Sequence, residues 1–418
     1  MFEIESQVRS YCRQYPETFD TAKGPFLYTT NAKEYLDFLS GCGSLNYGHN
    51  NPILKKALID YIERDGIAMG LDLQLTAKAE FLRALNDIIL SPRKLKYKVQ
   101  FPGPTGTNAV EAAIKLARKV TGRTNIIAFT NAFHGCSLGA LALTGSSHHR
   151  SASMPLLTNV TRWPYDRYFD NSVDTADMLE QLLSDPSSGF DAPAAIIVEL
   201  IQGEGGLRTA SPKWLKRIAH VAAAHGALLI VDDIQAGCGR SGKFFSFEGF
   251  DVVPDMVVLA KAISGFGLPM SLLLLKPDLD VWKAGEHNGT FRGNGHAFVT
   301  AAAALRTYWA DDNFAKILDR KVSVLDEIIN RICIRHGLKP RGRGLFRGVD
   351  LATQKFAESA RNECFKRGLI VETCGPHDEI LKLLPPLIVE ESELERASVI
   401  LNAALSEARA FEPALEIA

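Results

Sequence analysis

The sequence predicts an α/β fold built on a large, mainly parallel β-sheet, with a smaller α/β domain formed by both ends of the chain. Two observations carry this prediction. Short aliphatic runs alternate with helix-like segments through the middle of the chain, as in sheets whose strands are linked by helices. Each run is apolar without interruption, as expected for strands that are covered on both faces. The clearest strands are residues 125–129, 194–198, 227–231 and 256–259.

Helices are predicted between these strands, chiefly over residues 110–120 and 212–225. The second begins with Ser211 and Pro212, because serine caps free helix amides and proline fits the first helical position. The ends of the chain differ from the middle, with shorter strands and more turns. A hairpin is expected from residues 23–28 and 34–39. Further strands are expected over residues 345–349, 369–372 and 380–384.

These patterns divide the chain into a large domain and a small one. The large domain is expected to span residues 51–310, with the small domain assembled from residues 1–50 and 311–418.

Composition excludes several classes of function. Lys plus Arg number 47 against 48 acidic residues, a net charge of -1, so no basic surface for nucleic acid or anionic membrane is predicted. The seven cysteines form no CxxC pair, which indicates free thiols in a reducing compartment and no metal site. The N-terminus has no secretory pattern, and no apolar run approaches the ~20 residues of a membrane span. We therefore expect a cytoplasmic protein.

A lysine and an aspartate follow two of the predicted strands. Asp232 comes directly after residues 227–231, and Lys261 closes the run that begins at Met256. Open α/β sheets hold their ligands at the carboxyl ends of their strands. An amine and an acid there match pyridoxal phosphate (PLP), which needs a Schiff-base lysine and a carboxylate for its ring nitrogen. A solvated surface lysine is the alternative interpretation.

Three other segments have a chemical and a purely structural interpretation. Residues 103–108 form a Gly/Pro/Thr turn before a helix, which suits a phosphate but also describes an ordinary capped turn. Phe133 and His134 follow another strand, where an aromatic ring can stack on a flat cofactor. Alternatively, Phe133 is a core residue and His134 is hydrogen-bonded locally. Glu199 and Glu204 either line a site or cap a glycine-rich loop.

Together these motifs resemble the class III, PLP-dependent aminotransferases of fold type I, the aspartate-aminotransferase-like fold. The resemblance covers almost the whole chain. Within the family, Asn108 and Asp233 resemble the diaminobutyrate–2-oxoglutarate aminotransferases of ectoine biosynthesis, because most class III members carry Glu at both positions. The segments that carry the resemblance are residues 35–38, 45–49, 70–72, 103–109, 228–242, 263–269, 288–293 and 384–387, together with Lys261.

The resemblance implies a role for each site residue. Lys261 and Asp232 are the catalytic pair: the lysine binds PLP and moves the proton, and the aspartate holds the pyridine nitrogen. It also implies a homodimer or a dimer of dimers, with sites at the subunit interface. The implied cofactor contacts are Gly106, Thr107, Phe133, His134, Asp232, Ile234, Gln235 and Lys261, with Thr290 from a second subunit.

The implied reaction moves the amino group of L-glutamate to L-aspartate 4-semialdehyde, giving L-2,4-diaminobutyrate and 2-oxoglutarate, the first committed step of ectoine biosynthesis. Both substrates carry carboxylates, so cationic groups are expected in the pocket. Lys382 stands where some relatives have an arginine paired with the equivalent of Glu204. The candidate substrate residues are Glu204, Arg292, Arg347 and Lys382.

Several alternatives remain open on the sequence. The same PLP contacts suit another ω-aminotransferase, of ornithine or 4-aminobutyrate type, and an aminomutase or a decarboxylase. A non-catalytic protein of the same fold is a further alternative. A dinucleotide-binding enzyme is disfavoured, because the GxGxxG spelling at residues 237–242 comes late in the sheet and not after its first strand.

Overall fold

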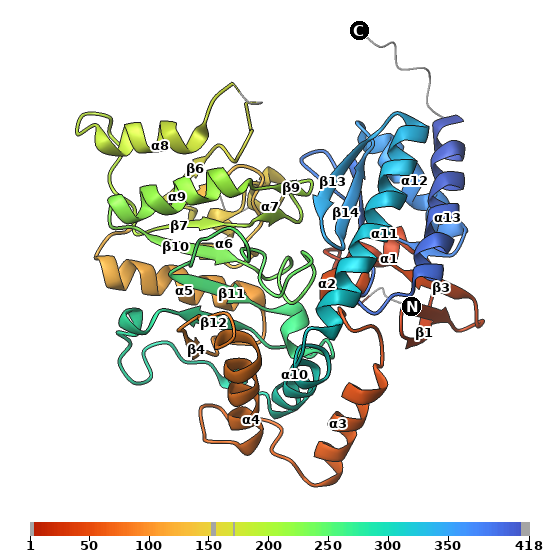
Figure 1. Ribbon diagram of the computed structural model, residues 1–418, viewed down its shortest axis with the longest axis horizontal. Coiled ribbons are helices and arrows are strands. Elements are labelled where there is room, and N and C mark those ends of the chain that lie inside the picture. The colour runs from red at the N-terminus through yellow and green to blue at the C-terminus, as the bar shows by residue number, and fades with distance from the viewer. Residues whose placement is uncertain (1–3, 152–155, 170–171, 411–418) are drawn as a thin grey trace.

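The computed structural model describes residues 4–151, 156–169 and 172–410. Its largest element is a seven-stranded sheet (Figure 1). Neighbouring strands from β11 to β6 run parallel, whereas β12 is antiparallel to both β11 and β4. The predicted α/β class with a mainly parallel sheet is confirmed. In spatial order the strands are β4 (Lys98–Gln100), β12 (Leu272–Leu275), β11 (Met256–Leu259), β10 (Leu228–Asp232), β7 (Ala195–Val198), β5 (Ile126–Phe129) and β6 (Val160–Trp163).

Helices cover both faces of this sheet, which explains why its strands are apolar throughout. Ile126 belongs to the core beneath α5 (Gly106–Thr121), whereas the next residue, Ile127, belongs to the core on the opposite face. That opposite face is covered by α9 (Pro212–Ala224), which packs against β10. Successive side chains of a strand point to opposite faces, so each strand contributes to both cores.

The starts of α5 and α9 are fixed by side-chain caps. The Ser211 hydroxyl accepts a hydrogen bond from the Trp214 amide at 3.3 Å, as the sequence predicted. The helix α5 begins earlier than predicted, at Gly106, because Thr105 and Asn108 form a reciprocal capping box. This cap brings the glycine and threonine of the predicted phosphate turn into the first turn of a helix.

The remaining helices of this half pack around the sheet and below it. The helix α10 packs against α3 and α4 at the bottom of Figure 1. The longer members are α3 (Pro52–Glu63), α4 (Thr76–Ala84) with its π-helical continuation η1 (Leu85–Leu90), α6 (Leu138–Leu143), α8 (Thr175–Ser184) and α10 (Gly295–Tyr308). The short helices are α7 (Ser147–Arg150), η3 (Lys261–Ser264), η4 (Pro277–Leu279) and η5 (Thr290–Arg292). Two more, α1 (Tyr11–Gln14) and α2 (Ser40–Gly43), lie with the C-terminal helices on the right of Figure 1.

A small sheet joins the two ends of the chain. The strand β15 pairs in parallel with β3, so the red and blue parts of Figure 1 lie side by side. The predicted hairpin is confirmed as β2 and β3, although Lys23 ends the preceding strand because Gly24 turns the chain at φ +57°. The domain boundaries remain predictions. The strands of this sheet are β1 (Phe19–Lys23), β2 (Phe26–Thr29), β3 (Glu34–Asp37) and β15 (Leu369–Ile370).

A second small sheet is antiparallel and lies against three long helices. The prediction of one strand over residues 369–372 is wrong, because the chain passes between the two small sheets at Val371. The Tyr15 hydroxyl donates a hydrogen bond to the Val371 carbonyl at this crossing. The strands are β13 (Lys339–Arg343), β14 (Phe346–Asp350), β17 (Ile380–Leu383) and β16 (Glu372–Cys374), and the helices are α11 (Asn313–His336), α12 (Gln354–Lys366) and α13 (Glu391–Ala410). A separate ribbon pairs β8 (Ile201–Gln202) with β9 (Arg208–Thr209).

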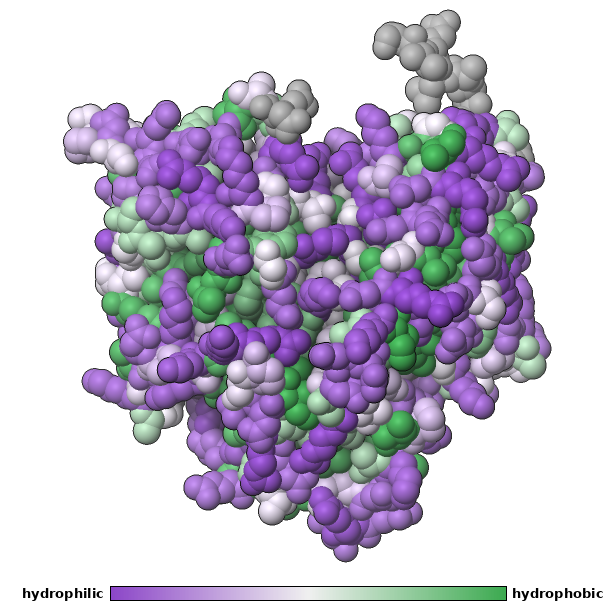
Figure 2. Space-filling model, in the orientation of Figure 1, coloured by the Kyte–Doolittle hydropathy of each residue, from purple (hydrophilic) through white to green (hydrophobic). Residues whose placement is uncertain are grey.

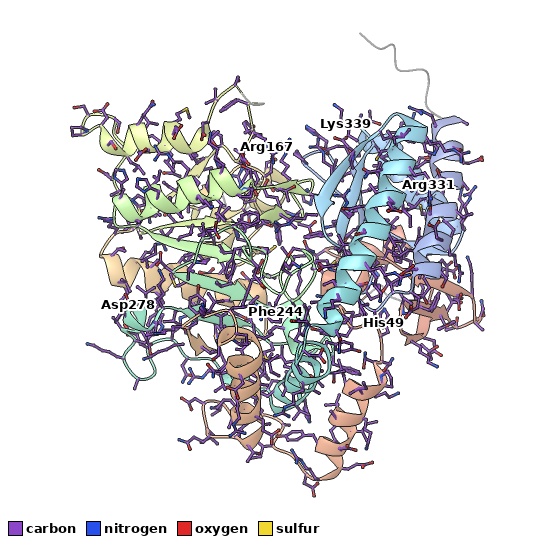
Figure 3. The ribbon with its side chains drawn as sticks, viewed as in Figure 1. His49, Arg167, Phe244, Asp278, Arg331 and Lys339 are labelled. Atoms are coloured by element: carbon purple, nitrogen blue, oxygen red, sulfur yellow. The ribbon has the colours of Figure 1, made fainter. Side chains whose placement is uncertain are left out.

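Buried aromatic side chains pack together near the centre of the molecule. Phe244, labelled near the centre of Figure 3, packs edge to face on Trp309 with ring centroids 5.1 Å apart. The visible surface is mainly hydrophilic, with scattered hydrophobic patches (Figure 2). Within the part of the chain that the structure describes, no helix combines the length and apolar character needed to cross a bilayer. All seven cysteines are described and unpaired, which confirms the prediction of free thiols.

Candidate active site

A cavity of about 390 Å³ opens at the carboxyl ends of the parallel strands. Asp232 is the last residue of β10, Lys261 follows β11, and Phe133 follows β5. The first turn of α5 completes the wall through Gly106 and Thr107. The structure therefore brings the predicted lysine, aspartate, aromatic ring and phosphate turn together, at the edge where open α/β sheets hold ligands.

Asp232 is held by a buried histidine. Its Oδ2 lies 2.7 Å from Nδ1 of His134, and its Oδ1 accepts a hydrogen bond from the Ile234 amide at 3.1 Å. Burial opposes the charged imidazole, but the Asp232 carboxylate raises the pKa of His134 above its ordinary value. His134 also lines the cavity, and its predicted cofactor contact remains a prediction. Its observed contact makes it a positioning residue for Asp232.

Lys261 has an unusual backbone conformation. It is the first residue of η3 and has a φ of +52°, in the left-handed region that residues other than glycine rarely occupy. Such strain costs on the order of 1–3 kcal/mol and is concentrated at functional sites. The side chain lines the cavity. The fold thus holds this lysine at the strand end in a conformation that the free chain disfavours.

The start of α5 forms a cradle of small residues. A Cβ atom at Gly106 would lie 2.8 Å from Cδ1 of Ile234, and one at Gly135 would lie 2.5 Å from Oγ1 of Thr107. The Thr107 hydroxyl is itself 2.5 Å from that of Ser137. Helix α5 presents free amides and the positive end of its dipole here. The arrangement suits an anion such as a phosphate.

Glu199 fixes the loop that carries Phe133. Its carboxylate accepts hydrogen bonds from the amides of Phe133 at 2.9 Å and Gly203 at 3.3 Å. Burial raises the pKa of the Glu199 carboxyl to about 7. The sequence left open whether the two glutamates of this loop cap it or line a site. The structure shows both: Glu199 caps the loop and lines the cavity, and Glu204 lines the cavity beside Gln235.

Lys382 lies behind Glu204 and is completely buried. Its Nζ is 2.9 Å from Oε1 of Glu204 and 3.0 Å from Oε1 of Glu372. Burial opposes its charge, but the two carboxylates raise the pKa of Lys382 well above its usual value. The sequence analysis missed Glu372. The pairing of β16 with β17 places Glu372 opposite Lys382, and this register was not predicted.

Besides Lys382, three predicted site residues do not line this cavity. Arg292 pairs with Asp72 at 2.5 Å, and Nε of Arg347 lies 3.1 Å from Asp326. Both guanidinium groups are thus bound to carboxylates elsewhere, and the structure does not bring them to the cavity of their own subunit. Thr290, expected to act in a second subunit, lies in η5, away from the cavity of its own chain.

The residues of the cavity fit PLP, the cofactor that the sequence resemblance implies. A buried carboxylate, a lysine, an aromatic ring and a helix start supply what its ring nitrogen, aldehyde, ring face and phosphate require. A volume of about 390 Å³ lies within the range of small-molecule sites. Among residues 4–151, 156–169 and 172–410, no group of three or more His, Cys, Asp or Glu side chains is arranged to hold a metal ion.

Comparison with known proteins agrees with this geometry. The family model described as aminotransferase class-III matches residues 11–405. The diaminobutyrate–2-oxoglutarate transaminases of Vibrio parahaemolyticus and Halalkalibacterium halodurans are 53% and 50% identical, each covering 96% of this chain, with 96% and 94% of the relative covered. The solved ornithine aminotransferase of Toxoplasma gondii superposes with a TM-score of 0.84 at 26% identity, over 97% of this chain and 93% of its own. Site geometry, fold and sequence agree: this chain belongs to the class III aminotransferases.

Proposed function

We propose that this protein is a PLP-dependent aminotransferase that moves the amino group of L-glutamate to L-aspartate 4-semialdehyde, yielding L-2,4-diaminobutyrate and 2-oxoglutarate. The observation that carries the proposal is the meeting of Lys261 and Asp232 in one cavity, beside Glu204 and its buried partner Lys382. The names of relatives at 50–53% identity support the choice of substrates.

Each residue of the cavity has a distinct task in this proposal. When bound, PLP supplies an aldehyde that takes up amino groups and a ring that stabilises negative charge at the substrate carbon. Lys261 anchors the cofactor and then carries the proton at Nζ. Asp232 holds the ring nitrogen protonated, because an opposite charge favours that form. Phe133 and Ile234 pack on the two faces of the cofactor ring. Gln235 binds the ring hydroxyl, and the start of α5 binds the phosphate.

Lys382 is the cation that both substrates need. Glutamate and aspartate semialdehyde each carry a carboxylate away from the reacting group, and a buried ammonium ion binds such a group strongly. The side chain of Glu204 is 38% exposed, so it is able to move aside and release the Lys382 ammonium. A lysine makes a point-charge contact, in contrast to the two-pronged contact of an arginine.

We also infer a homodimer or a dimer of dimers in which Thr290 enters the site of the neighbouring subunit. The hydrogen bond from the Gly70 amide to the Gly293 carbonyl joins two segments that expose large apolar side chains. Apolar groups gathered on a surface mark an interface. These exposed side chains are Ile67, Met69, Leu71, Leu73 and Phe291. Sedimentation of the wild type should give a dimer or tetramer, and Phe291→Asp should shift it to monomer. A monomeric wild type contradicts the inference.

Product analysis tests the proposed reaction. Purified protein with PLP, glutamate and aspartate semialdehyde should form diaminobutyrate and 2-oxoglutarate in equal amounts, faster than with any other amino acceptor or donor of a panel that includes ornithine and 4-aminobutyrate. Preference for ornithine or 4-aminobutyrate would assign a different ω-aminotransferase. Release of carbon dioxide, or amino-group migration without 2-oxoglutarate, would assign a decarboxylase or an aminomutase.

We further place the enzyme in the cytoplasm and its product in ectoine biosynthesis. The seven unpaired thiols fit a reducing compartment. The assignment to this pathway rests on the resemblance to the ectoine-type aminotransferases at Asn108 and Asp233. Deletion of the gene in its source organism should abolish ectoine accumulation under salt stress, and unchanged ectoine would contradict this placement.

A further inference from the structure

A second cavity, of about 510 Å³, adjoins the one that holds Lys261. Phe133 and Glu204 line both cavities, so the two spaces meet at these side chains. The second cavity is also lined by Tyr11 and Glu372. The second cavity therefore offers space beside Glu204 for the far end of a substrate whose reacting amine lies near Lys261.

Two carboxylates compete for one cation at this junction. Lys382 lies between Glu204 and Glu372, at 2.9 and 3.0 Å, and also donates a hydrogen bond to the Gly203 carbonyl at 3.3 Å. When all three side chains are ionised, the group carries one surplus negative charge. A simple carboxylate-binding site would need only the cation. The second acid is therefore unexplained by the recognition of a carboxylate.

Glu372 and Glu204 differ in exposure and in their contacts. The side chain of Glu372 is 5% exposed, against 38% for Glu204. Oε2 of Glu372 accepts a hydrogen bond from the Tyr11 hydroxyl at 3.2 Å. Its buried Oε1 lies 3.0 Å from Nζ of Lys382. Glu372 is thus a buried carboxylate that faces the Lys382 ammonium and lines the second cavity.

We propose that Glu372 determines specificity by accepting the α-ammonium group of a substrate whose terminal amine reacts, while Lys382 binds the α-carboxylate of the same molecule. This inference rests on the proposed function. L-2,4-Diaminobutyrate has both groups at its far end, matching one carboxylate and one ammonium on the protein. Glutamate presents only a carboxylate there, and it needs Lys382 alone.

Burial raises the pKa of the Glu372 carboxyl, and Lys382 counteracts this effect. A substrate ammonium beside Glu372 adds a second cation and stabilises the ionised carboxylate. A charged hydrogen bond of this kind changes binding by roughly tenfold or more. Its loss therefore produces a measurable change in substrate preference.

A matched pair of substrates isolates this contact. L-2,4-Diaminobutyrate and 4-aminobutyrate differ only in the α-ammonium group. The ratio of their kcat/KM values, measured with 2-oxoglutarate as acceptor, reports what that group contributes. Glu372→Gln should lower the ratio about tenfold or more, with kcat/KM for glutamate affected far less. Glu372→Asp, which keeps the charge, should retain part of the preference.

Glu358→Gln is the control, because Glu358 lines the same cavity without contacting Lys382. It should leave the ratio unchanged. If Glu372→Gln keeps the wild-type preference for diaminobutyrate over 4-aminobutyrate, the proposed role of Glu372 is overturned, whereas the proposed function is not. Loss of bound PLP in both Glu372 variants, seen in the absorption spectrum, would assign Glu372 to the fold and also overturn the role. A wild type that does not prefer diaminobutyrate would contradict the proposed function, and the inference with it.

Discussion

Replacement of His134 tests how the carboxylate at the centre of the site is held. His134→Phe keeps an aromatic ring but removes the nitrogen that lies 2.7 Å from Oδ2 of Asp232. Both side chains are buried, so Asp232 is left without this hydrogen-bond partner. A charge-assisted hydrogen bond contributes about 1.5–3 kcal/mol. We therefore expect the Kd for PLP to rise roughly 10- to 150-fold, because Asp232 without this bond is no longer held in place to face the ring nitrogen.

The assay is equilibrium titration of the apoprotein with PLP, followed by tryptophan fluorescence and cofactor absorption. His134→Asn is the matched variant, since its amide nitrogen lies near the position of the lost Nδ1. It should recover most of the affinity. Circular dichroism checks that both variants are folded. If His134→Phe binds PLP within about threefold of the wild type, the His134–Asp232 bond contributes less than 1 kcal/mol and the reasoning is refuted.

Two further predictions concern stability. Arg240 is fully buried and donates to the Leu345 and Pro385 carbonyls and to Asn46, so Arg240→Met leaves three acceptors unpaired. It should lower the free energy of unfolding by about 3–5 kcal/mol, and an unchanged denaturation midpoint would contradict this. Burial raises the pKa of Asp233 from 3.8 to about 7, so ionisation destabilises the fold as pH rises. Between pH 4 and 7 the wild type should lose up to about 4 kcal/mol relative to Asp233→Asn. If the free energies of unfolding of the wild type and Asp233→Asn, measured by urea denaturation, change in parallel with pH, the expected destabilisation is refuted.

The large sheet was predictable because its strands are buried on both faces. The strand β11 is apolar throughout, and β10 is apolar up to its last residue, Asp232. Asp232 and Ala260, which directly follows β11, both line the cavity. The direction of β12 was not predictable, since four leucines look alike in parallel and antiparallel strands. The change of sheet at Val371 was missed for a similar reason. Both strands there are short, and no Gly or Pro between Leu369 and Cys374 marks the break.

Site residues at the end of a strand were predictable from the sequence. A residue whose place depends on the register of two paired strands was less so. Asp232 ends a strand, Lys261 and Phe133 each follow one, and all three line one cavity. Glu372 reaches Lys382 only through the pairing of two short C-terminal strands. No local sequence pattern indicated where Arg292 and Arg347 lie in the fold. Arg292 pairs with Asp72, which is distant in the sequence and which no periodicity connects to it.

The central claim is that Lys261 carries out amino transfer in this cavity. The most direct test is a single-turnover reaction of PLP-loaded Lys261→Ala with excess L-glutamate, measured as 2-oxoglutarate formed per site beside the wild type. The wild type should form close to one equivalent rapidly. The variant should retain PLP through the start of α5 and Asp232, but form 2-oxoglutarate at least roughly 10²-fold more slowly. Formation of 2-oxoglutarate at the wild-type rate by Lys261→Ala would contradict the claim.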